Sequence, residues 1–501
     1  MITFEEFSVL AGNYNVVPLV RPLLADTLTP VSTYMTLRQE GTPSFILESV
    51  EANEKIGRYS FIGVGPRLLL RARGTHITIR EQGNTRHLNE NLYALIESLV
   101  SRYRSAPVEG RHGLAGGFVG YLGYNTIRHI ERIQIGDPGA ADEDDAMLGL
   151  FGAVVQFDHR AQLITIVQNI FVEPGVELRD QYNAARTALD TLELRLRRSP
   201  VASDNFRCEP APEESRDERH TFEESVRRAK EAITEGEIFQ VVLSRRVRRA
   251  FSGDLFAVYR ALRIINPSPY LFFLDFGDTM LVGSSPEVLV RSRQGLVELL
   301  PIAGTRRRGR DEEEDRVLAE ELLHDAKELA EHVMLVDLGR NDVGRIATYG
   351  SVDVPVFKRI DRYSHVMHIV SEVRGRLQEG ISPVDVLKAC FPAGTVSGAP
   401  KVRAMEIIHE LEPVHRGAYA GAVGYIGFDG TLDMCIAIRT IIACRGMLNI
   451  QAGAGIVADS VPEREYEETV SKARALNEAV TLAAAGLPSE RLARGEGARI
   501  P

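Results

Sequence analysis

Two pairs of glutamates, each spaced three residues apart, are the side chains of this sequence most clearly able to do chemistry. Glu328 and Glu331 lie in the segment DAKELAEH, and Glu465 and Glu468 lie in EREYEETVSK. If both segments are helical, each pair projects from one helical face, and two facing helices would gather four carboxylates. Magnesium suits such a cluster, because it prefers oxygen ligands and keeps positions open for an anionic substrate. An ordinary solvated helix face, with an ion pair between Glu468 and Lys472, would produce the same spacing.

The composition is that of a large globular protein. The chain has 501 residues, 44% hydrophobic and 26% charged, which is ordinary usage and enough for about two or three domains. Its net charge of -10 argues against a nucleic-acid partner, because phosphate binding needs a concentrated basic face. The sequence has no apolar run of the roughly 18 residues that cross a membrane. Four cysteines without CxxC spacing and an N-terminus unlike a secretory signal lead us to expect a cytoplasmic protein.

Hydrophobic periodicity and turn residues predict an α+β fold with large, mostly antiparallel sheets. We expect the main helices at residues 87–104, 178–197, 221–236, 312–338, 382–390, 400–411 and 463–484, and strands that begin near residues 76, 148, 162, 239, 270, 432 and 448. Residues 198–220 are rich in Pro, Ser and charge, so we predict a linker there, followed by a helix that Thr221 and Glu224 cap. The chain is thereby divided into an N-terminal region (1–197), the linker (198–220), a second region (221–484) and a flexible polar tail (485–501).

One sequence pattern occurs twice. GFVGYLGYN begins at Gly117 and GAVGYIGFD begins at Gly421, and both follow GxxGYxG with a subsequent aromatic residue and Asn or Asp. Glycine permits close backbone approach within a sheet, so the two copies are predicted to be matching central strands of two related sheets. A short match of this kind can also arise by coincidence.

A glycine-broken loop supplies a further candidate site. CFPAGTVSGAPK, from Cys390, ends one helix, exposes Thr395 and Ser397, and starts the next helix near Pro400. Free backbone N–H groups at that helix start could hold an anion. An ordinary helix-to-helix loop is the alternative.

With this loop the sequence resembles the chorismate-utilising enzymes, most closely anthranilate synthase component I. The resemblance rests on FILES, PIAGTRRRG, DAKELAEHVMLVDLGRND, YSHVMHIVS, CFPAGTVSGAPK, IAIRT and QAGAGIVADSVPEREYEETVSKA, which span about residues 45–475. It implies a two-lobed core of sheets flanked by helices, with the active site in the cleft. It also assigns chorismate binding and catalysis to region 221–484 and a regulatory site to region 1–197.

The resemblance implies a set of site residues as well. A Mg²⁺ ion, bound to the ring carboxylate of chorismate, would lie among Glu328, Glu331, Glu465 and Glu468. Catalytic roles fall to His368, Thr395 and Glu328. Substrate contacts are expected from Thr305, Thr395, Tyr419, Arg439, Gly453, Ala454, Gly455 and Lys472. Arginine suits this task, because its planar fork can pair with a carboxylate through two hydrogen bonds.

Three positions distinguish members of the family by their nucleophile. Gln240 stands where water-using members carry a lysine that activates water, and an amide cannot act as that base. Ala303 stands where many aminodeoxychorismate synthases carry a nucleophilic lysine, and alanine has no nucleophile. His368 matches the anthranilate synthase histidine that is expected to protonate the departing C4 hydroxyl. Together they predict direct attack of ammonia at ring carbon C2.

We therefore expect a magnesium-dependent lyase of tryptophan biosynthesis that makes anthranilate and pyruvate from chorismate through 2-amino-2-deoxyisochorismate. No cysteine lies in a Gly-x-Cys-x-Gly elbow, so a built-in glutaminase is not expected. The resemblance implies a separate glutamine amidotransferase subunit as the source of ammonia, in a heterotetramer of two plus two. The alternatives are a phenazine-type synthase that stops at aminodeoxyisochorismate and a catalytically dead subunit that only binds tryptophan.

A second site is expected near the N-terminus. Its residues resemble the tryptophan feedback site of the family and comprise Leu47, Glu48, Ser49, Asn266, Pro269, Tyr270 and Leu271. The carboxylate of Glu48 would bind the ammonium group of L-tryptophan, while Leu271 replaces a methionine common in that motif. The simpler alternative is that Glu48 only ends a strand.

Overall fold

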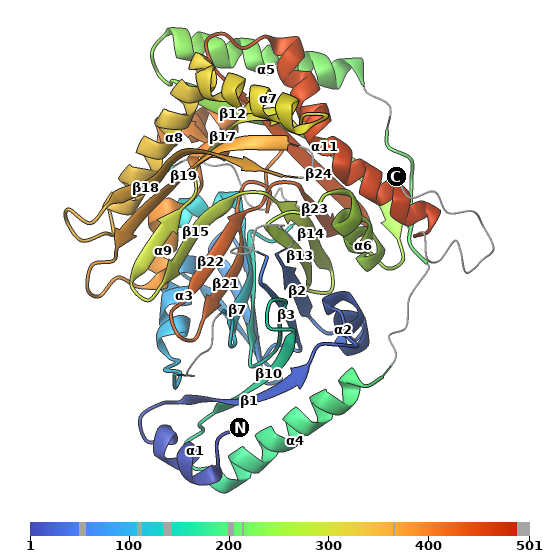
Figure 1. The fold of residues 1–501 in the computed structure, drawn as a ribbon, viewed down its shortest axis with the longest axis vertical. Coiled ribbons are helices and arrows are strands. Elements are labelled where there is room, and N and C mark those ends of the chain that lie inside the picture. Colours follow the sequence, from blue (N-terminus) through green and yellow to red (C-terminus); the bar gives the residue numbers. More distant parts are fainter. Residues whose placement is uncertain are drawn as a thin grey trace.

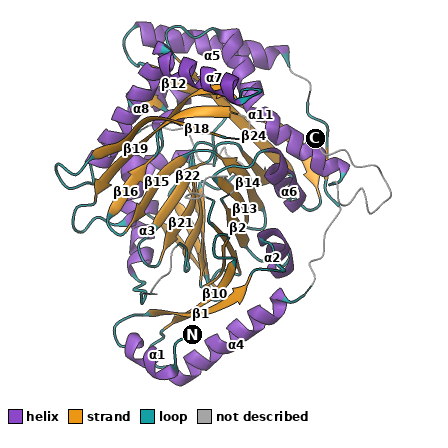
Figure 2. Cartoon of the chain, in the orientation of Figure 1, coloured by secondary structure: helices purple, strands orange, loops and turns teal. Residues whose placement is uncertain are grey.

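Two large antiparallel sheets form the centre of the molecule, and helices lie around them (Figure 1). The computed structural model describes residues 1–49, 57–107, 113–133, 143–198, 205–212, 215–363 and 366–487. Figure 2 shows the strands gathered inside and the helices at the periphery. The predicted α+β class with large, mostly antiparallel sheets is confirmed.

The first sheet contains 12 strands among the described residues. In spatial order these are β1 (Val16–Leu24), β10 (Leu163–Phe171), β9 (Ala153–Asp158), β3 (Tyr59–Val64), β2 (Ser44–Glu48), β13 (Tyr270–Asp275), β14 (Thr279–Ser285), β23 (Thr440–Cys444), β24 (Met447–Ile456), β12 (Gln240–Ser252) and β11 (Arg207–Cys208), with β20 (Gly398–Ala399) beside β12.

The second sheet also contains 12 strands within the described ranges. Their order is β17 (Ile302–Arg307), β19 (Val366–Arg376), β16 (Leu296–Leu299), β15 (Val288–Arg293), β22 (Leu432–Ile436), β21 (Ala422–Gly427), β7 (Gly117–Leu122), β8 (Ala146–Phe151), β4 (Leu68–Arg73), β5 (His76–Glu81) and β6 (Asn84–Asn89), with β18 (Asp353–Arg362) beside β19.

Helices pack against both sheets. The first sheet contacts α2 (Pro30–Leu37), α4 (Leu178–Leu196), α5 (Arg216–Thr234), α6 (Phe256–Ile265), α10 (Lys401–Leu411) and α11 (Pro462–Ala485), and α1 (Phe4–Ala11) lies beside α4. The second sheet contacts α7 (Glu312–His324), α8 (Ala326–Gly344) and α9 (Pro383–Cys390), with α3 (Leu92–Ser101) packed on α9. The described residues also include two short 3₁₀ helices, η1 (Tyr124–His129) and η3 (Gly394–Val396), which connect strands and helices.

Two predicted helix boundaries were wrong because side-chain caps fall elsewhere. The helix expected over 312–338 is interrupted at Asp325, whose carboxylate accepts the first free backbone N–H groups of α8. The helix expected from Thr221 begins earlier, because Ser215 accepts a hydrogen bond from the N–H of Glu218 and caps α5.

Three further predicted elements have wrong boundaries because strand pairing with distant residues decides where they end. The strand expected from residue 432 is split into β22 and β23, which belong to different sheets. The strand expected from residue 148 is likewise split into β8 and β9. The helix expected over 87–104 is shortened to α3, because residues 84–89 pair with β5 as strand β6.

Strands of the N-terminal and second regions alternate in both sheets. The first sheet joins them where β2 pairs with β13, and the second sheet joins them where β7 pairs with β21. Part of the expected linker is also packed: Phe206 is buried, and β11 pairs with β12. Residues 199–204, 213–214 and 488–501, which belong to the expected linker and tail, lie outside the described part.

The two halves of the chain share one topology. Outward from its centre, the first sheet runs β2, β3, β9, β10, β1 on one side and β13, β14, β23, β24, β12 on the other. The second sheet runs β7, β8, β4, β5, β6 and, on the other side, β21, β22, β15, β16, β19. The GxxGYxG copies are therefore equivalent strands, but their expected placement in two sheets was wrong. They pair with each other, with Gly120 opposite Gly424.

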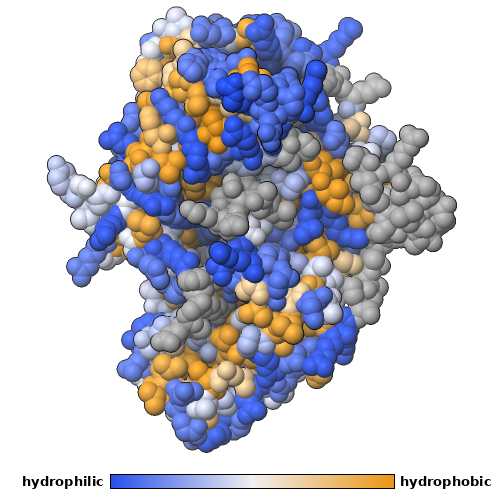
Figure 3. Space-filling view, in the orientation of Figure 1, coloured by the Kyte–Doolittle hydropathy of each residue, from blue (hydrophilic) through white to orange (hydrophobic). Residues whose placement is uncertain are grey.

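The face of the molecule drawn in Figure 3 is mainly hydrophilic. Figure 3 shows hydrophobic side chains in separated patches, several of them over the end of the molecule that holds α1, β1 and α4. Within the described residues, none of the helices combines the length and the apolar character that a membrane crossing requires.

Close backbone packing at the sheet centre gives a first prediction. A Cβ atom at Gly120 would lie 2.0 Å from the carbonyl oxygen of Met147. Gly120→Ala should lower the free energy of unfolding by about 1–3 kcal/mol, because the backbone cannot yield without disturbing the ladder. Denaturant titration measures the difference. Gly344→Ala is the control, since a Cβ there meets no atom within 4 Å and alanine favours the helix. Equal stability of wild type and Gly120→Ala would contradict this packing.

Candidate active site

A cleft opens where two strand pairs pass from one sheet to the other. β14 pairs with β23 in the first sheet, and their continuations, β15 and β22, pair in the second. At the crossing, the N–H of Ile436 donates to the carbonyl of Glu287 at 3.0 Å, and the N–H of Ser284 donates to the carbonyl of Arg439 at 3.0 Å. Arg439 has a φ of +50°, so the chain turns sharply there. Both charged side chains therefore face the space between the sheets.

The cleft has a volume of about 560 Å³ and brings together most of the expected site residues. Its walls include Gln240, Ala303, Thr305, Glu328, Glu331, His368, Thr395, Tyr419, Arg439, Gly453, Gly455, Glu465, Glu468 and Lys472. Ala454 differs from this set, because its side chain packs with Val241 and Leu243 in the core beneath β12 and β24. Ala454 is therefore an expected site residue that does not line the cleft.

The four glutamates face the same cleft from α8 and α11. Burial raises the pKa of Glu331, and the neighbouring carboxylates of Glu328 and Glu468 raise it further. Burial likewise raises the pKa of Glu465. Among the neighbouring cations, Lys472 has Nζ 2.6 Å from Glu468 and Arg306 has Nη1 3.7 Å from Glu328. Lys327 also lines the cleft, and its charge opposes the rise in the pKa of Glu331 and Glu465. The carboxylates outnumber these cations, which is the donor chemistry that a hard divalent cation prefers.

The cluster is looser than the expected cage. Within the described ranges, no three His, Cys, Asp or Glu side chains converge into a complete metal site. Mg²⁺ commonly takes one or two protein carboxylates and completes its octahedron with water and substrate oxygens. The glutamates therefore fit a magnesium ion held by a subset of the four rather than by all of them at one point.

Arg439 and Lys472 supply positive charge beside these carboxylates. Nη1 of Arg439 donates to the backbone carbonyl of Lys472 at 2.5 Å, and Nζ of Lys472 donates to the carbonyl of Gly453 at 3.0 Å. Burial lowers the pKa of Arg439, while Tyr419 and Glu287 oppose this shift. Because the Arg439 guanidinium bonds to a carbonyl rather than to a carboxylate, it can still pair with a substrate carboxylate through two hydrogen bonds.

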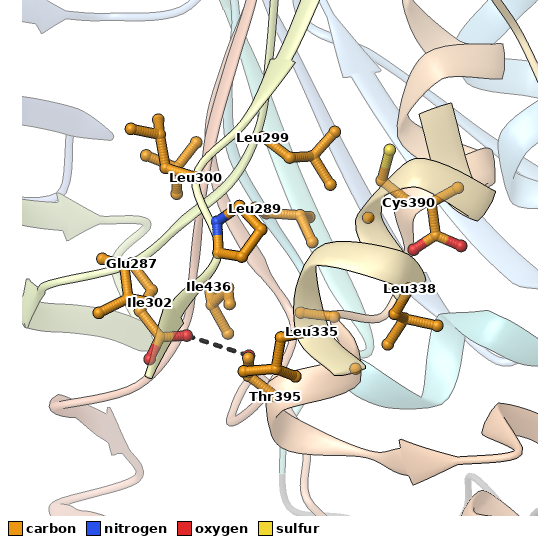
Figure 4. Close-up of a pocket in the computed structure, with 16 residues that line it drawn as sticks. Glu287, Leu289, Leu299, Leu300, Ile302, Leu335, Leu338, Cys390, Thr395 and Ile436 are labelled. Carbon is orange, nitrogen blue, oxygen red and sulfur yellow. Dashed lines mark hydrogen bonds between the residues drawn. The ribbon is translucent and has the colours of Figure 1, made fainter. Parts of the chain in front are cut away.

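Glu287 is a candidate residue that sequence reasoning missed. Its carboxylate accepts a hydrogen bond from Thr395 Oγ1 at 3.0 Å, and Figure 4 shows this pair with apolar side chains gathered around it. A small cavity of about 50 Å³ lies behind it, lined by Leu289, Leu338 and Ile436 among others. Burial raises the pKa of Glu287, so this carboxyl holds its proton at higher pH than an ordinary glutamate. A glutamate inside the apolar run LVGSSPEVLV was the available signal.

His368 is held in one tautomer. Its Nδ1 lies 2.9 Å from the carbonyl oxygen of Gly304 and 3.1 Å from Thr305 Oγ1. Because a carbonyl oxygen only accepts, Nδ1 carries the proton, and the neutral ring keeps a lone pair on Nε2. Burial lowers the pKa of His368, and the charge of Arg439 adds to this effect. The ring is therefore mainly unprotonated near neutral pH, with a free lone pair on Nε2.

The expected inhibitor residues surround a separate cavity of about 620 Å³ between the sheets. Leu47, Glu48, Ser49, Pro269, Tyr270 and Leu271 line it. Asn266 lies outside this lining and bonds to Ser284. The Glu48 side chain is only 1% exposed, and its carboxylate accepts hydrogen bonds from Tyr259 and Arg263. Ser49 Oγ has no partner among the described residues, so a hydroxyl remains for a ligand.

Comparison with known proteins agrees with this geometry. The sequence pattern of the chorismate binding enzyme family matches residues 42–478. The chain belongs to this family. Anthranilate synthase component 1 of Aquifex aeolicus is 47% identical over 96% of this chain and 98% of its own length. The Pseudomonas putida protein of the same name is also 47% identical, over 96% and 98%.

Solved structures of chorismate-binding enzymes have the same fold. Anthranilate synthase component I from Streptococcus pneumoniae is 34% identical, with a TM-score of 0.72 over 91% of this chain and 99% of that one. The menaquinone-specific isochorismate synthase of Escherichia coli has a TM-score of 0.69 over 95% and 98%, and its 20% identity supports the fold alone. The predicted resemblance to anthranilate synthase component I is confirmed.

The carboxylate cluster gives a prediction about stability. A carboxyl whose pKa is raised on folding destabilises the folded enzyme when ionised, and this penalty disappears as pH falls through the folded pKa. Metal-free Glu331→Gln should therefore melt roughly 1–3 °C higher than wild type at pH 7.5. The gain should vanish near pH 4.5, the ordinary value for this carboxyl. Differential scanning calorimetry measures both.

Glu463→Gln is the control, because Glu463 is an exposed glutamate at the start of α11, the helix that carries Glu465 and Glu468. Its melting temperature should stay close to that of wild type at both pH values. A lower melting temperature for Glu331→Gln at pH 7.5 would show that the carboxylates do not repel one another.

Proposed function

We propose that this enzyme is an anthranilate synthase component 1, a Mg²⁺-dependent lyase that acts in the cytoplasm in tryptophan biosynthesis. It converts chorismate and ammonia to anthranilate and pyruvate through 2-amino-2-deoxyisochorismate. A glutamine amidotransferase subunit supplies the ammonia, in a heterotetramer of two plus two. The observation that carries the proposal is a cleft in which Gln240 and Ala303 stand beside Arg439 and the four glutamates. Such a cleft would bind an anionic ring. Neither position 240 nor position 303 carries the lysine that other members of the family use.

Substrate binding uses charges already present in the cleft. Arg439 pairs with a carboxylate of chorismate, and Tyr419 and the backbone of Gly453 and Gly455 border the ring. The glutamates of α8 and α11 would hold the magnesium ion. When bound, that ion would neutralise the ring carboxylate and polarise the ring.

Ammonia addition requires a proton donor for the leaving hydroxyl. A bond forms between nitrogen and C2, the two ring double bonds shift, and the C4–O bond breaks. We assign the donor to Glu287 rather than to His368, because the pKa of Glu287 is raised and that of His368 is lowered. The hydroxyl leaves as water, and the new ammonium centre releases one proton. Thr395 orients the donor through its hydrogen bond to Glu287.

Pyruvate elimination requires a base. Nε2 of neutral His368 takes the hydrogen at C2 as a proton, the C3–O bond breaks, and the ring becomes aromatic. The enolpyruvate that leaves takes up a proton at its methylene carbon and becomes pyruvate. The hydrogen bond from Nδ1 to Gly304 keeps Nε2 unprotonated for this step.

The deciding experiment mixes the purified enzyme with chorismate, Mg²⁺ and an ammonium salt. We expect anthranilate fluorescence and pyruvate to appear in equal amounts, and EDTA to abolish both. Chorismate consumption without pyruvate would indicate a phenazine-type synthase instead. No consumption at all would indicate a regulatory subunit, and either outcome would reject the proposed reaction.

The two proton-transfer roles separate in variants. His368→Asn can keep the hydrogen bond to Gly304 but has no second ring nitrogen, so pyruvate release should fall by roughly 100-fold or more. Chorismate should still be consumed, and aminodeoxyisochorismate should accumulate. Glu287→Gln should slow chorismate consumption itself by a similar factor. Product analysis by chromatography distinguishes the intermediates, and equal losses of both steps in His368→Asn would contradict its role as a base.

We also propose that the 620 Å³ cavity binds L-tryptophan as a feedback inhibitor. The β21–β22 hairpin connects the two sites: Tyr425 and Asp433 line the inhibitor cavity, whereas Tyr419 and Arg439, just beyond its ends, line the active-site cleft. An inhibitor that shifts this hairpin would move substrate contacts.

Filling the inhibitor cavity should abolish feedback. Ser49→Phe places a ring where the ligand would lie, so added tryptophan should no longer lower turnover, while turnover without tryptophan continues. Inhibition curves for both proteins make the comparison. Inhibition of Ser49→Phe at wild-type concentrations would move the effector site elsewhere.

A further inference from the structure

Another cavity, of about 130 Å³, lies behind the active-site cleft. It is bounded by η1 and by the segment that follows α10, with Tyr124, Asn125, Glu412 and Arg416 among its lining residues. His409 and Pro413 also line it and are exposed at the protein surface. The cavity therefore reaches from the surface toward the interior.

One layer of side chains separates this cavity from the cleft. Arg416 is 2% exposed and donates to the carbonyl oxygens of Val242 and Val396, each at 2.6 Å. Both valines line the active-site cleft. The guanidinium also lies 4.6 Å from the ring centre of Tyr124, in the cavity, and 5.7 Å from that of Tyr419, in the cleft.

A hydrogen-bonded chain crosses the same wall. Glu412, which pairs with Arg416 at 2.6 Å, accepts a hydrogen bond from Ser244 Oγ at 2.8 Å. Ser244 Oγ in turn accepts from Gln451 Nε2 at 2.8 Å. Because the serine proton is committed to Glu412, Gln451 must offer its N–H group, and its carbonyl oxygen is fixed in the opposite direction. Gln451 lines the cleft and is 2% exposed.

On both sides of this wall, buried polar atoms have no hydrogen-bond partner among the described residues. They are Tyr124 Oη and Asn125 Nδ2 at the cavity and Gln451 Oε1 at the cleft. A buried polar group left unsatisfied costs about 1–3 kcal/mol. A small molecule that both donates and accepts hydrogen bonds would satisfy them in succession. Ammonia has that chemistry, with three N–H donors and one lone pair.

We propose that ammonia reaches the ring through this cavity and wall, and that Gln451 Oε1 positions it for attack. This inference rests on the proposed ammonia-dependent reaction. The glutamates of α8 and α11 would hold the metal ion and the ring carboxylate on their side of the cleft, so the nucleophile would arrive from the wall beside Gln240. An N–H of ammonia donates to Gln451, and its lone pair then points away from the amide, toward the ring.

The outer end of the path is tested with His409→Trp, which places a larger ring at the cavity mouth. At saturating chorismate, kcat/KM for ammonia should fall several-fold, while the KM for chorismate stays unchanged. His76→Trp, at an exposed position on β5, is the matched control and should behave as wild type. Equal ammonia kinetics in the two variants would overturn this route.

The inner end is tested with Gln451→Met, which keeps the side-chain length but removes both polar atoms. The KM for ammonia should rise roughly five- to tenfold, as expected for the loss of one hydrogen bond. Ser244→Ala keeps the Gln451 Oε1 acceptor but removes the hydrogen bond that orients the Gln451 amide, so we expect a smaller rise in the KM for ammonia. An unchanged KM for ammonia in Gln451→Met, or a rise only in the KM for chorismate, would overturn the positioning role. A wild-type enzyme without ammonia-dependent turnover would reject the proposed function and this inference together.

Discussion

The crossing of two paired strands between the sheets is the constraint on which the active site depends. β14 and β23 separate from β15 and β22 at one level, and two backbone hydrogen bonds hold the crossings together. Residues at such a crossing belong to neither regular sheet face, so their side chains enter the space between the layers. Glu287 and Arg439 are thereby fixed opposite each other by backbone structure. An acid and a cation could not be held this rigidly on surface loops.

Charge imbalance is the second property of the cleft. Four glutamates from α8 and α11 share a partly buried volume with Arg439 and Lys472, and ion pairs such as Lys472–Glu468 compensate their charge only in part. Burial makes this arrangement costly for the empty protein. A divalent cation and an anionic ring would relieve both sides at once. The same residues that destabilise the protein are therefore those that would bind a dicarboxylate strongly in a low-dielectric site.

Proton chemistry follows from environment rather than from residue type. Glu287 lies against apolar side chains and Thr395, which favours its protonated form. His368 is buried near Arg439 and donates its Nδ1 proton to Gly304, which favours the neutral ring. Burial shifts the two pKa values in opposite directions, because it disfavours the charged form of each group. These environments support the proposed roles of Glu287 as proton donor and His368 as base.

The sequence by itself determined what depends on neighbouring residues: the α+β class, the helical glutamate pairs, most helix positions and the family, through strings such as CFPAGTVSGAPK. Tertiary structure decided what depends on distant partners. The strand from residue 432 divides because β22 and β23 pair with different sheets, and the GxxGYxG copies meet because Gly120 and Gly424 permit contact. Glu287 became a candidate acid only through burial by strands and helices far along the chain, and local sequence carries little information about burial of that kind.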